Sequence, residues 1–255
     1  MILVDMSQIM MASIMMQMHM SKKSEPDEEM VRHMILNSLR MYRTRFLSEF
    51  GEMVLCYDSR HYWRRDYFPE YKHSRRKSRG TDDKNWDIIF NCLNTIKEEV
   101  KSNMPYKSVE VYGAEADDVI ATLCSESSNE VMILSGDKDF IQLQKFPNVK
   151  QYSPITKKMI NGMNPDDYLK EHVLKGDTSD GVPNVLSPDN TFVDGIRQRP
   201  LSKKKIATMV EGDFPNDEVK RNYQRNKKLI DLTCSPDELR SEILDTYKSA
   251  PVNDR

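Results

Sequence analysis

The chain has 255 residues, of which 38% are hydrophobic and 31% charged, so it can bury a sizeable core beneath a heavily charged surface. Glycine is scarce and low-complexity tracts are absent, which argues against long disordered segments. The formal net charge is only −2, and the four cysteines (56, 92, 124, 234) form no CxxC pair, so we expect buried thiols rather than zinc ligands or disulfides.

The N-terminal twenty residues are apolar and Met-rich, but they lack a basic n-region and carry Asp5 in the apolar stretch. These features are unlike a secretory signal, and the segment is too polar to span a bilayer. We therefore expect ILV at 2–4 to be a buried strand and the Met-rich residues 10–20 to be a core helix.

Further short runs of Val, Ile and Leu predict buried strands, and helical spacing predicts the helices between them. The strands are 53–57, 108–112 and 130–134, and the helices are 25–47, 82–101 and 114–124. The first of these helices should begin after Ser24 as N-cap, with acids in its first turn. Alternating strands and helices predict an α/β core with a mostly parallel central sheet flanked by helices.

The pattern changes after residue 145. Residues 149–153 and 157–160 predict a small hairpin, residues 164–176 a helix, and the chain from about 203 a set of short helices. We therefore expect an α/β core over residues 1–175 and a helical C-terminal region over residues 176–255.

Acidic residues follow each of the four predicted parallel strands. They are Asp5; Asp58; the group Glu115, Asp117 and Asp118; and the pair Asp137 and Asp139. A fifth acidic site, Asp177 and Asp180 in KGDTSDG, follows a predicted helix. Acids are common on surfaces and at helix N-caps, but in open α/β sheets the carboxyl edge of the strands is where ligands bind. Acids after all four strands favour a shared site.

Clustered carboxylates need cations, and oxygen ligands favour Mg²⁺ or Mn²⁺ over zinc. Two such ions about 4 Å apart can activate a water molecule and stabilise the leaving oxygen of a phosphodiester. Residues 60–79 contain eight Lys or Arg, and a second basic cluster lies at 197–205. These segments are suited to holding a phosphate backbone.

The motifs, taken in order, resemble those of the flap endonuclease or 5′-3′ exonuclease family, and most closely its T-even-type phage RNase H members. They are ILVD at 2–5, LCYD at 55–58, EYKHSRR at 70–76, AEADD at 114–118, SGDKDF at 135–140 and GDTSDGVPNV at 176–185. The resemblance implies a PIN-like 5′-nuclease core. It also implies a metal-dependent 5′-3′ exonuclease and flap endonuclease with RNase H activity, which removes RNA primers and 5′ flaps during DNA replication.

The resemblance further implies two Mg²⁺ ions, for which Mn²⁺ would substitute. Asp5, Asp58, Glu115, Asp117 and Asp137 would form the first ligand group, and all but Glu115 of these would also be catalytic. Asp118, Asp139, Asp177 and Asp180 would form the second group, partly through water. The split of these acids between the two ions is left open.

Residues 59–84 occupy the place of the family's mobile arch, and Lys72 matches its catalytic lysine, which contacts the scissile phosphate. One or two of Arg64, Arg65, Arg75 and Arg76 would clamp the single-stranded 5′ end. Tyr71 and the neighbouring aromatics could stack on unpaired bases, or they could pack beneath a solvated basic helix face.

Lys203, Lys204 and Lys205 lie where the family has a helix–hairpin element that grips duplex phosphates, although the glycines of that element are missing here. The expected partners are DNA and RNA–DNA duplexes with 5′ single-stranded ends, and by family a single-strand-binding protein and a sliding clamp. We expect a monomer without a membrane partner, in the cytoplasm (the host cytoplasm if phage-encoded). A few methionines of residues 10–20 could form a wedge against the duplex end.

Two alternatives stay open. A Toprim-like primase or topoisomerase domain also uses a Glu and a DxD pair at strand ends, but the AEADD and GDTSD groups and the basic segment argue against it. A catalytically inactive, structure-specific DNA-binding protein should lack some of the acids, and here all the expected ones are present. A nicotinamide-binding protein is excluded because no GxGxxG follows a strand.

Overall fold

The computed structural model describes residues 1–80 and 84–252, without the side chains of Ser74, Arg76, Lys77 and Ser78. The chain divides into two compact units. The first, here called the sheet unit, comprises Met1–Arg60, Asp83–Asn161 and Asp237–Arg255. The second, the helical unit, comprises His61–Asp82 and Gly162–Pro236.

A six-stranded sheet forms the centre of the sheet unit, in the order β3-β2-β1-β4-β5-β6. The strands are β1 (Ile2–Asp5), β2 (Met53–Cys56), β3 (Lys107–Val109), β4 (Val131–Leu134), β5 (Val149–Ser153) and β6 (Lys158–Ile160). All neighbours are parallel except β5 and β6, which form the predicted hairpin. The predicted mostly parallel sheet is confirmed. Strand β3 is shorter than the predicted strand 108–112. Glu110 lies just beyond its end and forms ion pairs with Lys97 and Lys101.

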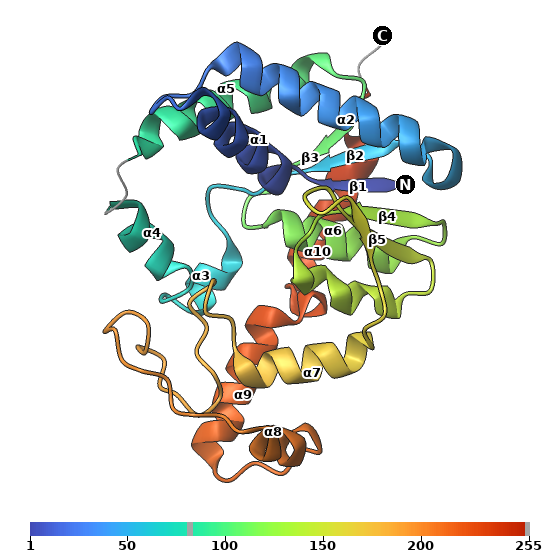
Figure 1. The fold of residues 1–255 in the computed structure, drawn as a ribbon. Helices are drawn as coiled ribbons and strands as arrows, with labels where there is room; N and C mark the ends of the chain where they lie inside the picture. The colour runs from blue at the N-terminus through green and yellow to red at the C-terminus, as the bar shows by residue number, and fades with distance from the viewer. Residues whose placement is uncertain (81–83, 253–255) are drawn as a thin grey trace. The chain divides into compact units, whose positions relative to one another are not determined.

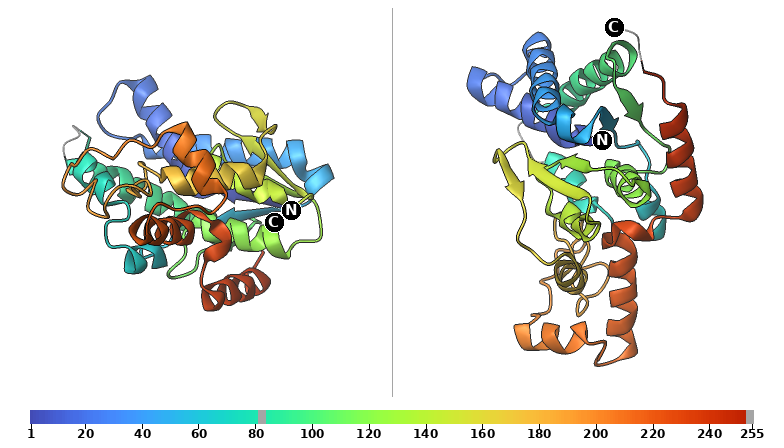
Figure 2. Two further views of the ribbon diagram at one scale, coloured as in Figure 1. Left: turned by 90° about the horizontal axis from the view of Figure 1, so that it is seen from below. Right: turned by 90° about the vertical axis from the view of Figure 1, so that its right-hand side faces the viewer.

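Helices cover both faces of this sheet (Figures 1 and 2). Helices α1 (Met6–Ser21), α2 (Glu28–Phe50) and α5 (Trp86–Asn103) lie on one side, and α6 (Ala116–Glu126) and α10 (Asp237–Ser249) on the other. A 3₁₀ helix, η1 (Lys138–Lys145), follows β4. Alternate strand residues such as Val4, Leu55 and Leu134 pack in a common core with the apolar faces of α1, α2 and α5. The four cysteines are free thiols; Cys56, Cys92 and Cys124 are buried, as predicted, whereas Cys234 is half-buried.

Two helices begin later than the sequence predicted, because side chains further along the chain cap them. Asp27, rather than Ser24, is the N-cap of α2, and its carboxylate accepts a hydrogen bond from Met30 N at 3.2 Å. Asn85 caps α5 in the same way through Ile88 N, at 3.3 Å. Residues 82 and 83 of the predicted helix lie outside the described residues.

The Met-rich segment forms α1, as predicted, and it contributes Met10 and Met18 to the core. Met16 and Met20 remain 57% and 73% exposed, so a contact of these side chains with a duplex end stays a prediction. None of the helices in the described part of the chain has the length and apolarity needed to cross a membrane.

The helical unit contains α3 (Trp63–Tyr67), α4 (His73–Gly80), α7 (Pro165–Lys175), α8 (Lys203–Val210), α9 (Asp217–Ile230) and η2 (Leu232–Cys234). Helix α7 packs against both α8 and α9 (Figure 1). One apolar cluster joins Phe68 and Tyr71 to Val173, Val182 and Leu229. A second cluster lies between α7, α8 and α9.

This division differs from the predicted boundary near residue 175. Helix α10 packs on α6 and β3, so the end of the described chain belongs with the sheet rather than with the helical region. Most of the predicted arch, residues 61–80, belongs to the helical unit because Phe68 and Tyr71 are part of its core. Both contacts join residues far apart in the chain, which local sequence patterns do not report.

Gly176 ends α7 in a conformation that requires glycine. Its φ is +69°, and a Cβ at this position would lie 2.6 Å from Pro183 O and closer still to Val182 O. Gly176→Ala is therefore expected to lower the free energy of unfolding by more than the about 1–3 kcal/mol that the backbone conformation alone costs. Gly212→Ala is the control, because Gly212 has a φ of +88° with nothing within 4 Å. Urea denaturation of the two variants compares them, and equal losses would contradict a collision at Gly176.

Candidate active site

Three acids of the sheet unit, Asp5, Asp58 and Asp137, lie at the topological switch point of the sheet. Strand β1 pairs with β2 on one side and β4 on the other, so the connections that leave these strands diverge at their carboxyl ends. Asp5 ends β1, Asp58 follows β2 and Asp137 follows β4. Ligands bind at this position in open parallel sheets. The structure thus brings together acids from three distant parts of the chain.

Asp5 is the most strongly perturbed of these acids. It is 7% exposed and accepts hydrogen bonds from Gln8 N at 3.0 Å and from the Ser135 hydroxyl at 2.9 Å. Burial, followed by repulsion from Asp58, raises the pKa of Asp5 to about 7, and Asp137 adds to the repulsion. A carboxylate in this environment is costly at neutral pH unless a cation shares the site.

Asp58 joins the end of β2 to the start of α6. Its Oδ1 accepts a hydrogen bond from Ala116 N at 2.8 Å, and its Oδ2 accepts one from the Ser7 hydroxyl at 2.6 Å. The backbone supports the same junction, because Ser59 N donates to Ala114 O at 3.0 Å. Asp58 itself is exposed and held in place by neutral donors, so its charge is available to a cation.

Glu115 and Asp118 form a capping box at the start of α6, in which Asp118 Oδ2 accepts from Glu115 N at 2.9 Å. Asp118 is fully buried. One oxygen of Asp118 therefore satisfies the helix N-terminus, and its assignment to the second ion stays a prediction. Glu115 is also buried, whereas Asp117 in the first turn is half-buried. Ligation by Glu115 and Asp117 stays a prediction.

The turn after β4 carries Asp137 and Asp139. Asp137 caps η1, where its Oδ1 accepts from Asp139 N at 3.0 Å, and its own N donates to the Ser135 hydroxyl at 3.1 Å. Asp137 is exposed and Asp139 half-buried. A Cβ at Gly136 would lie 2.8 Å from Ser153 Oγ, so the turn approaches β5 closely and a larger residue would displace that hydroxyl.

Several polar residues that hold this turn were not predicted from the sequence. Gln8 accepts from Gly136 N at 2.6 Å, and Gln151, fully buried on β5, donates to Ser135 O at 3.0 Å and to Asp137 O at 2.6 Å. Ser7 and Ser135 bind the carboxylates of Asp58 and Asp5. The only sequence signal was a polar Ser-Gln pair in the first turn after Asp5, within an otherwise apolar segment.

The donor set fits divalent cations with oxygen ligands. Asp58 and Asp137 both repel the carboxylate of Asp5, and the groups that bind Asp5 and Asp58 are hydroxyls and backbone amides. Hard cations such as Mg²⁺ prefer carboxylate oxygens and would relieve this repulsion. Cys56 lies beside Asp5 in the sheet, but burial and the Asp5 carboxylate raise the pKa of its thiol, so a thiolate site for a softer metal is not indicated.

In the helical unit, Asp177 and Asp180 lie in a closed loop, called here the acidic loop (residues 177–182). Asp177 N donates to Val182 O at 2.8 Å and Val182 N to Asp177 O at 2.7 Å, which closes the loop at its base. Inside it, Asp177 Oδ1 accepts from Ser179 N and from the Ser179 hydroxyl, both at 2.7 Å. The loop therefore has a defined shape, and Asp177 is part of what maintains it.

Asp180 is surrounded by groups from the arch segment. The Tyr71 hydroxyl donates to its Oδ2 at 2.7 Å, Lys72 Nζ lies 3.5 Å from the same oxygen, and Arg75 forms an ion pair with Oδ1. Burial alone would raise the pKa of Asp180, but Lys72 and Arg75, with the Tyr71 hydrogen bond and Arg64, hold it below its usual value. A direct metal contact by Asp180 would have to compete with these cations, so its ligand role stays a prediction.

Lys72 is positioned by its backbone as well as by its charge. Its φ is +57°, a left-handed conformation that is rare outside glycine, and its N donates to Asp180 O at 2.7 Å. Gly181 makes room for this contact, because a Cβ there would lie 3.1 Å from Glu70 O and 3.5 Å from Lys72 N. A strained backbone held by a long-range contact is typical of functional residues.

Two residues predicted to contact nucleic acid are instead buried in the helical unit. Arg64 is 1% exposed, and its Nε donates to Leu229 O at 2.9 Å at the end of α9. Tyr71 is 4% exposed, and its hydroxyl donates a hydrogen bond to Asp180. Both predictions are corrected, because packing against α9 and the acidic loop removes these two side chains from the surface. They instead hold the arch segment against the rest of the helical unit.

The other arch residues remain candidates for nucleic-acid contacts. Arg75 is 44% exposed at its side chain, and Arg65 is half-buried with its guanidinium 4.6 Å from the Tyr62 ring centroid. Tyr67 is 49% exposed, whereas Phe68 packs in the core. The Arg76 side chain lies outside the described part of the structure.

Lys203, Lys204 and Lys205 are all exposed in the first turn of α8. Ser202 caps this helix by accepting from Lys205 N at 3.3 Å. A helix N-terminus attracts anions, and three lysines add to that attraction. The placement is compatible with the predicted phosphate contacts, which stay a prediction.

Comparison with known proteins relates this chain to nucleases. Residues 1–173 match the family model described as the 5′-3′ exonuclease N-terminal resolvase-like domain. Ribonuclease H of Enterobacteria phage T4 is 34% identical over 266 aligned positions, which cover 97% of this chain and 86% of that protein. The flap endonuclease Xni of Shewanella sp. strain MR-4 is 29% identical over 134 positions, covering 48% of each chain.

Solved structures show the same fold. A bacteriophage T5 flap endonuclease, crystallised in a complex with DNA and metal ions, superposes with a TM-score of 0.67 over 97% of this chain and 99% of its own. The two sequences are 15% identical. The T5 5′-exonuclease with bound zinc gives a TM-score of 0.64 over 98% of this chain and 99% of its own, also at 15% identity.

Proposed function

This chain belongs to the 5′-3′ exonuclease family and is a nuclease of the exonuclease and flap endonuclease type, and we propose that its hydrolysis of phosphodiesters depends on two Mg²⁺ ions. The observation that carries the metal proposal is the environment of Asp5. It is a buried carboxylate whose pKa is raised to about 7 by burial and by repulsion from Asp58 and Asp137. Mn²⁺ should substitute, because it accepts the same oxygen ligands.

Each group of residues has a distinct part in this proposal. Asp5, Asp58, Glu115, Asp117 and Asp137 would hold divalent ions, which when bound supply an activated water and stabilise the leaving oxygen. Asp118, Asp139, Asp177 and Asp180 would support ion binding, in part through water. Lys72 would stabilise negative charge on the reacting phosphate, and Arg65, Arg75 and the three lysines of α8 would bind flanking phosphates.

The proposed substrates are DNA and RNA–DNA duplexes with a single-stranded 5′ end. This proposal rests on the similarity of the chain to a ribonuclease H and to a flap endonuclease, and on the basic first turn of α8. The biological role would be removal of RNA primers and 5′ flaps in replication by a cytoplasmic monomer (in the host cytoplasm if phage-encoded). A single-strand-binding protein and a sliding clamp are the proposed protein partners.

A time course of cleavage tests the metal dependence and the substrate class together. The substrates are 5′-labelled nicked, flapped and RNA-primed duplexes, each incubated with Mg²⁺, with Mn²⁺ and with EDTA. We expect short labelled products with either ion and none with EDTA, because in this proposal the ions supply the activated water and stabilise the leaving oxygen.

A matched duplex with a blocked, hairpin-closed 5′ end is the control, and it should resist cleavage from that end. Cleavage that persists in EDTA would overturn the metal proposal. Equal cleavage of the closed duplex would overturn the requirement for a free 5′ end.

A further inference from the structure

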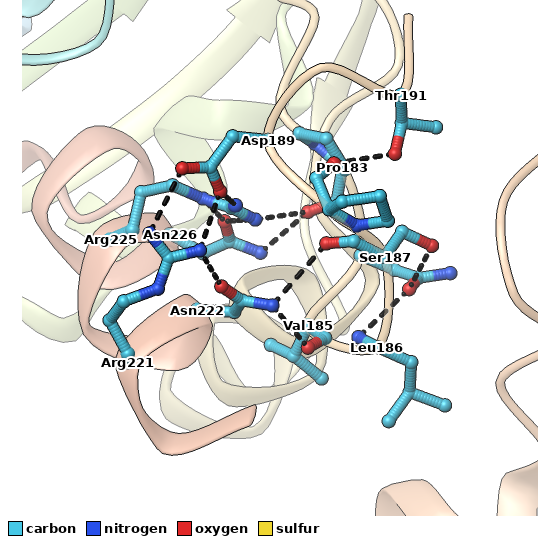
Figure 3. A network of polar contacts seen from close by, with 12 residues as sticks. Pro183, Val185, Leu186, Ser187, Asp189, Thr191, Arg221, Asn222, Arg225 and Asn226 are labelled. Atoms are coloured by element: carbon cyan, nitrogen blue, oxygen red, sulfur yellow. Dashed lines mark hydrogen bonds and ion pairs between the residues drawn. The ribbon is translucent and has the colours of Figure 1, made fainter. Parts of the chain in front are cut away.

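Helix α9 carries a buried side chain that binds both ends of the acidic loop. Asn226 is fully buried, and its Nδ2 donates to Val173 O and to Pro183 O, both at 2.9 Å. Val173 lies on α7 just before the loop and Pro183 immediately after it. Figure 3 shows Asn226 with its amide directed at Pro183. One amide group thus ties together the two chain segments that enter and leave the acidic loop.

The orientation of Asn226 is itself fixed by Arg225. Asn226 Oδ1 accepts from Arg225 Nε at 2.9 Å and from Nη2 at 2.8 Å, and the same Nη2 donates to Pro183 O at 3.1 Å. Arg225 is 5% exposed and forms an ion pair with Asp189. Because the oxygen of Asn226 is occupied by a guanidinium, its amide hydrogens must face the two carbonyls.

We propose that Asn226 is a positioning residue for Asp177 and Asp180. By fixing the separation of Val173 and Pro183, it keeps the acidic loop closed before any cation binds. The inference rests on the proposed function, in which these two acids support divalent ions, and adds a residue from α9 that touches neither the ions nor the substrate. A loop held closed in advance loses less conformational entropy when it binds an ion.

Asn222, one helical turn earlier on α9, provides a matched control. It is also fully buried, and its Nδ2 donates to Val185 O at 3.0 Å and Ser187 O at 3.3 Å, beyond the acidic loop (Figure 3). Asn222 accepts from Arg221 as Asn226 does from Arg225. The two asparagines therefore have the same burial and the same kind of partners, but they hold different segments.

The first test measures amide hydrogen exchange in EDTA, where neither metal nor activity is involved. Asn226→Asp keeps the volume of the side chain but turns an oxygen towards two carbonyls. Exchange across residues 177–182 is expected to accelerate about tenfold or more, because two buried carbonyls lose their donor and the loop opens locally. In Asn222→Asp the same segment should exchange at the wild-type rate.

The second test measures Mn²⁺ binding by paramagnetic resonance and the Mg²⁺ dependence of cleavage. In Asn226→Asp, the dissociation constant of the weaker of the two Mn²⁺ sites should rise about tenfold, which corresponds to about 1.4 kcal/mol. The Mg²⁺ concentration needed for half-maximal rate should also rise about tenfold. The rate at saturating Mg²⁺ should stay close to wild type. Asn222→Asp should bind Mn²⁺ normally. If Asn226→Asp fails to fold, Asn226→Ala, which removes the donor without adding a charge, takes its place.

Equal effects of the two substitutions on the acidic loop would overturn the inference, since they would indicate a general loss of stability. Unchanged exchange in Asn226→Asp would also overturn it. If the wild-type protein failed to cleave any substrate, the proposed function would fail, whereas the exchange result in EDTA would still decide the role of Asn226.

Discussion

Asp5→Asn is expected to abolish cleavage and, at the same time, to raise the melting temperature of the protein in EDTA at pH 8. Burial and repulsion raise the pKa of Asp5 from 3.8 to about 7 in the folded protein. The folded state therefore binds the proton more tightly than the unfolded state, and the free energy of unfolding falls as the pH rises from about 4 to 7. At pH 8 the ionised Asp5 lowers the free energy of unfolding by its full amount, which is at most about 4 kcal/mol for a pKa raised by about three.

Asparagine removes this charge while it retains an acceptor for Gln8 N, so the gain in stability should be largest at pH 8 and smaller at pH 5. Thermal melts at both pH values in EDTA measure it, and the cleavage assay with Mg²⁺ measures the loss of function. Added Mg²⁺ should raise the melting temperature of the wild type more than that of the variant.

Asp245→Asn is the matched control for Asp5→Asn. Asp245 is an acid of α10 in the same unit with an 80% exposed side chain, so neither stability nor cleavage should change. A variant at Asp5 that still cleaves, or that melts lower than wild type in EDTA at pH 8, would contradict the assignment of Asp5 to a cation site.

Lys72→Met is expected to slow cleavage about 100-fold or more at saturating metal, the effect typical of removing one charged group that stabilises a transition state. Methionine retains the unbranched stem of the side chain without its charge, and Asp180 keeps its contacts with Tyr71 and Arg75, so the acidic loop should stay ordered. Single-turnover cleavage gives the rate of the chemical step, and binding of a flapped duplex in EDTA gives the affinity. The affinity should change far less than the rate.

Lys220→Met is the control for Lys72→Met, because Lys220 is an exposed lysine of α9 in the same unit. It should cleave at the wild-type rate. If Lys72→Met weakened binding as much as it slowed cleavage, Lys72 would bind the substrate without stabilising the transition state. An unchanged rate would remove Lys72 from the reaction.

The parallel sheet and the location of its acids were predictable from the sequence because both follow from local patterns. Short runs of Val, Ile and Leu specify buried strands, and an acid directly after such a run must lie at the carboxyl edge of a parallel sheet. Asp5, Asp58 and Asp137 could therefore be brought to one edge without knowledge of the strand order. The hairpin of β5 and β6 and the helix α7 were predicted on the same local basis.

The role of Asp118 could not be decided in this way. An acid three residues after Glu115 suits both a metal ligand and a capping box, and the two alternatives have the same spacing. The structure shows that the capping box is formed, since Asp118 is fully enclosed and bonded to Glu115 N, while its assignment to an ion stays a prediction. Burial depends on what packs over the helix start, which a local sequence pattern does not report.

The sequence by itself determined the class of fold, the edge at which the carboxylates gather and the chemistry that they favour. Only the tertiary structure decided which basic and aromatic residues of the arch are available at the surface. Arg64 binds Leu229 O and Tyr71 binds Asp180, partners 165 and 109 positions away in the chain. The tertiary structure also revealed the contacts of Asn226, whose two carbonyl partners lie 53 and 43 positions away. Strand and cap preferences act between near neighbours, whereas these contacts exist only after distant segments have packed together and lost access to water.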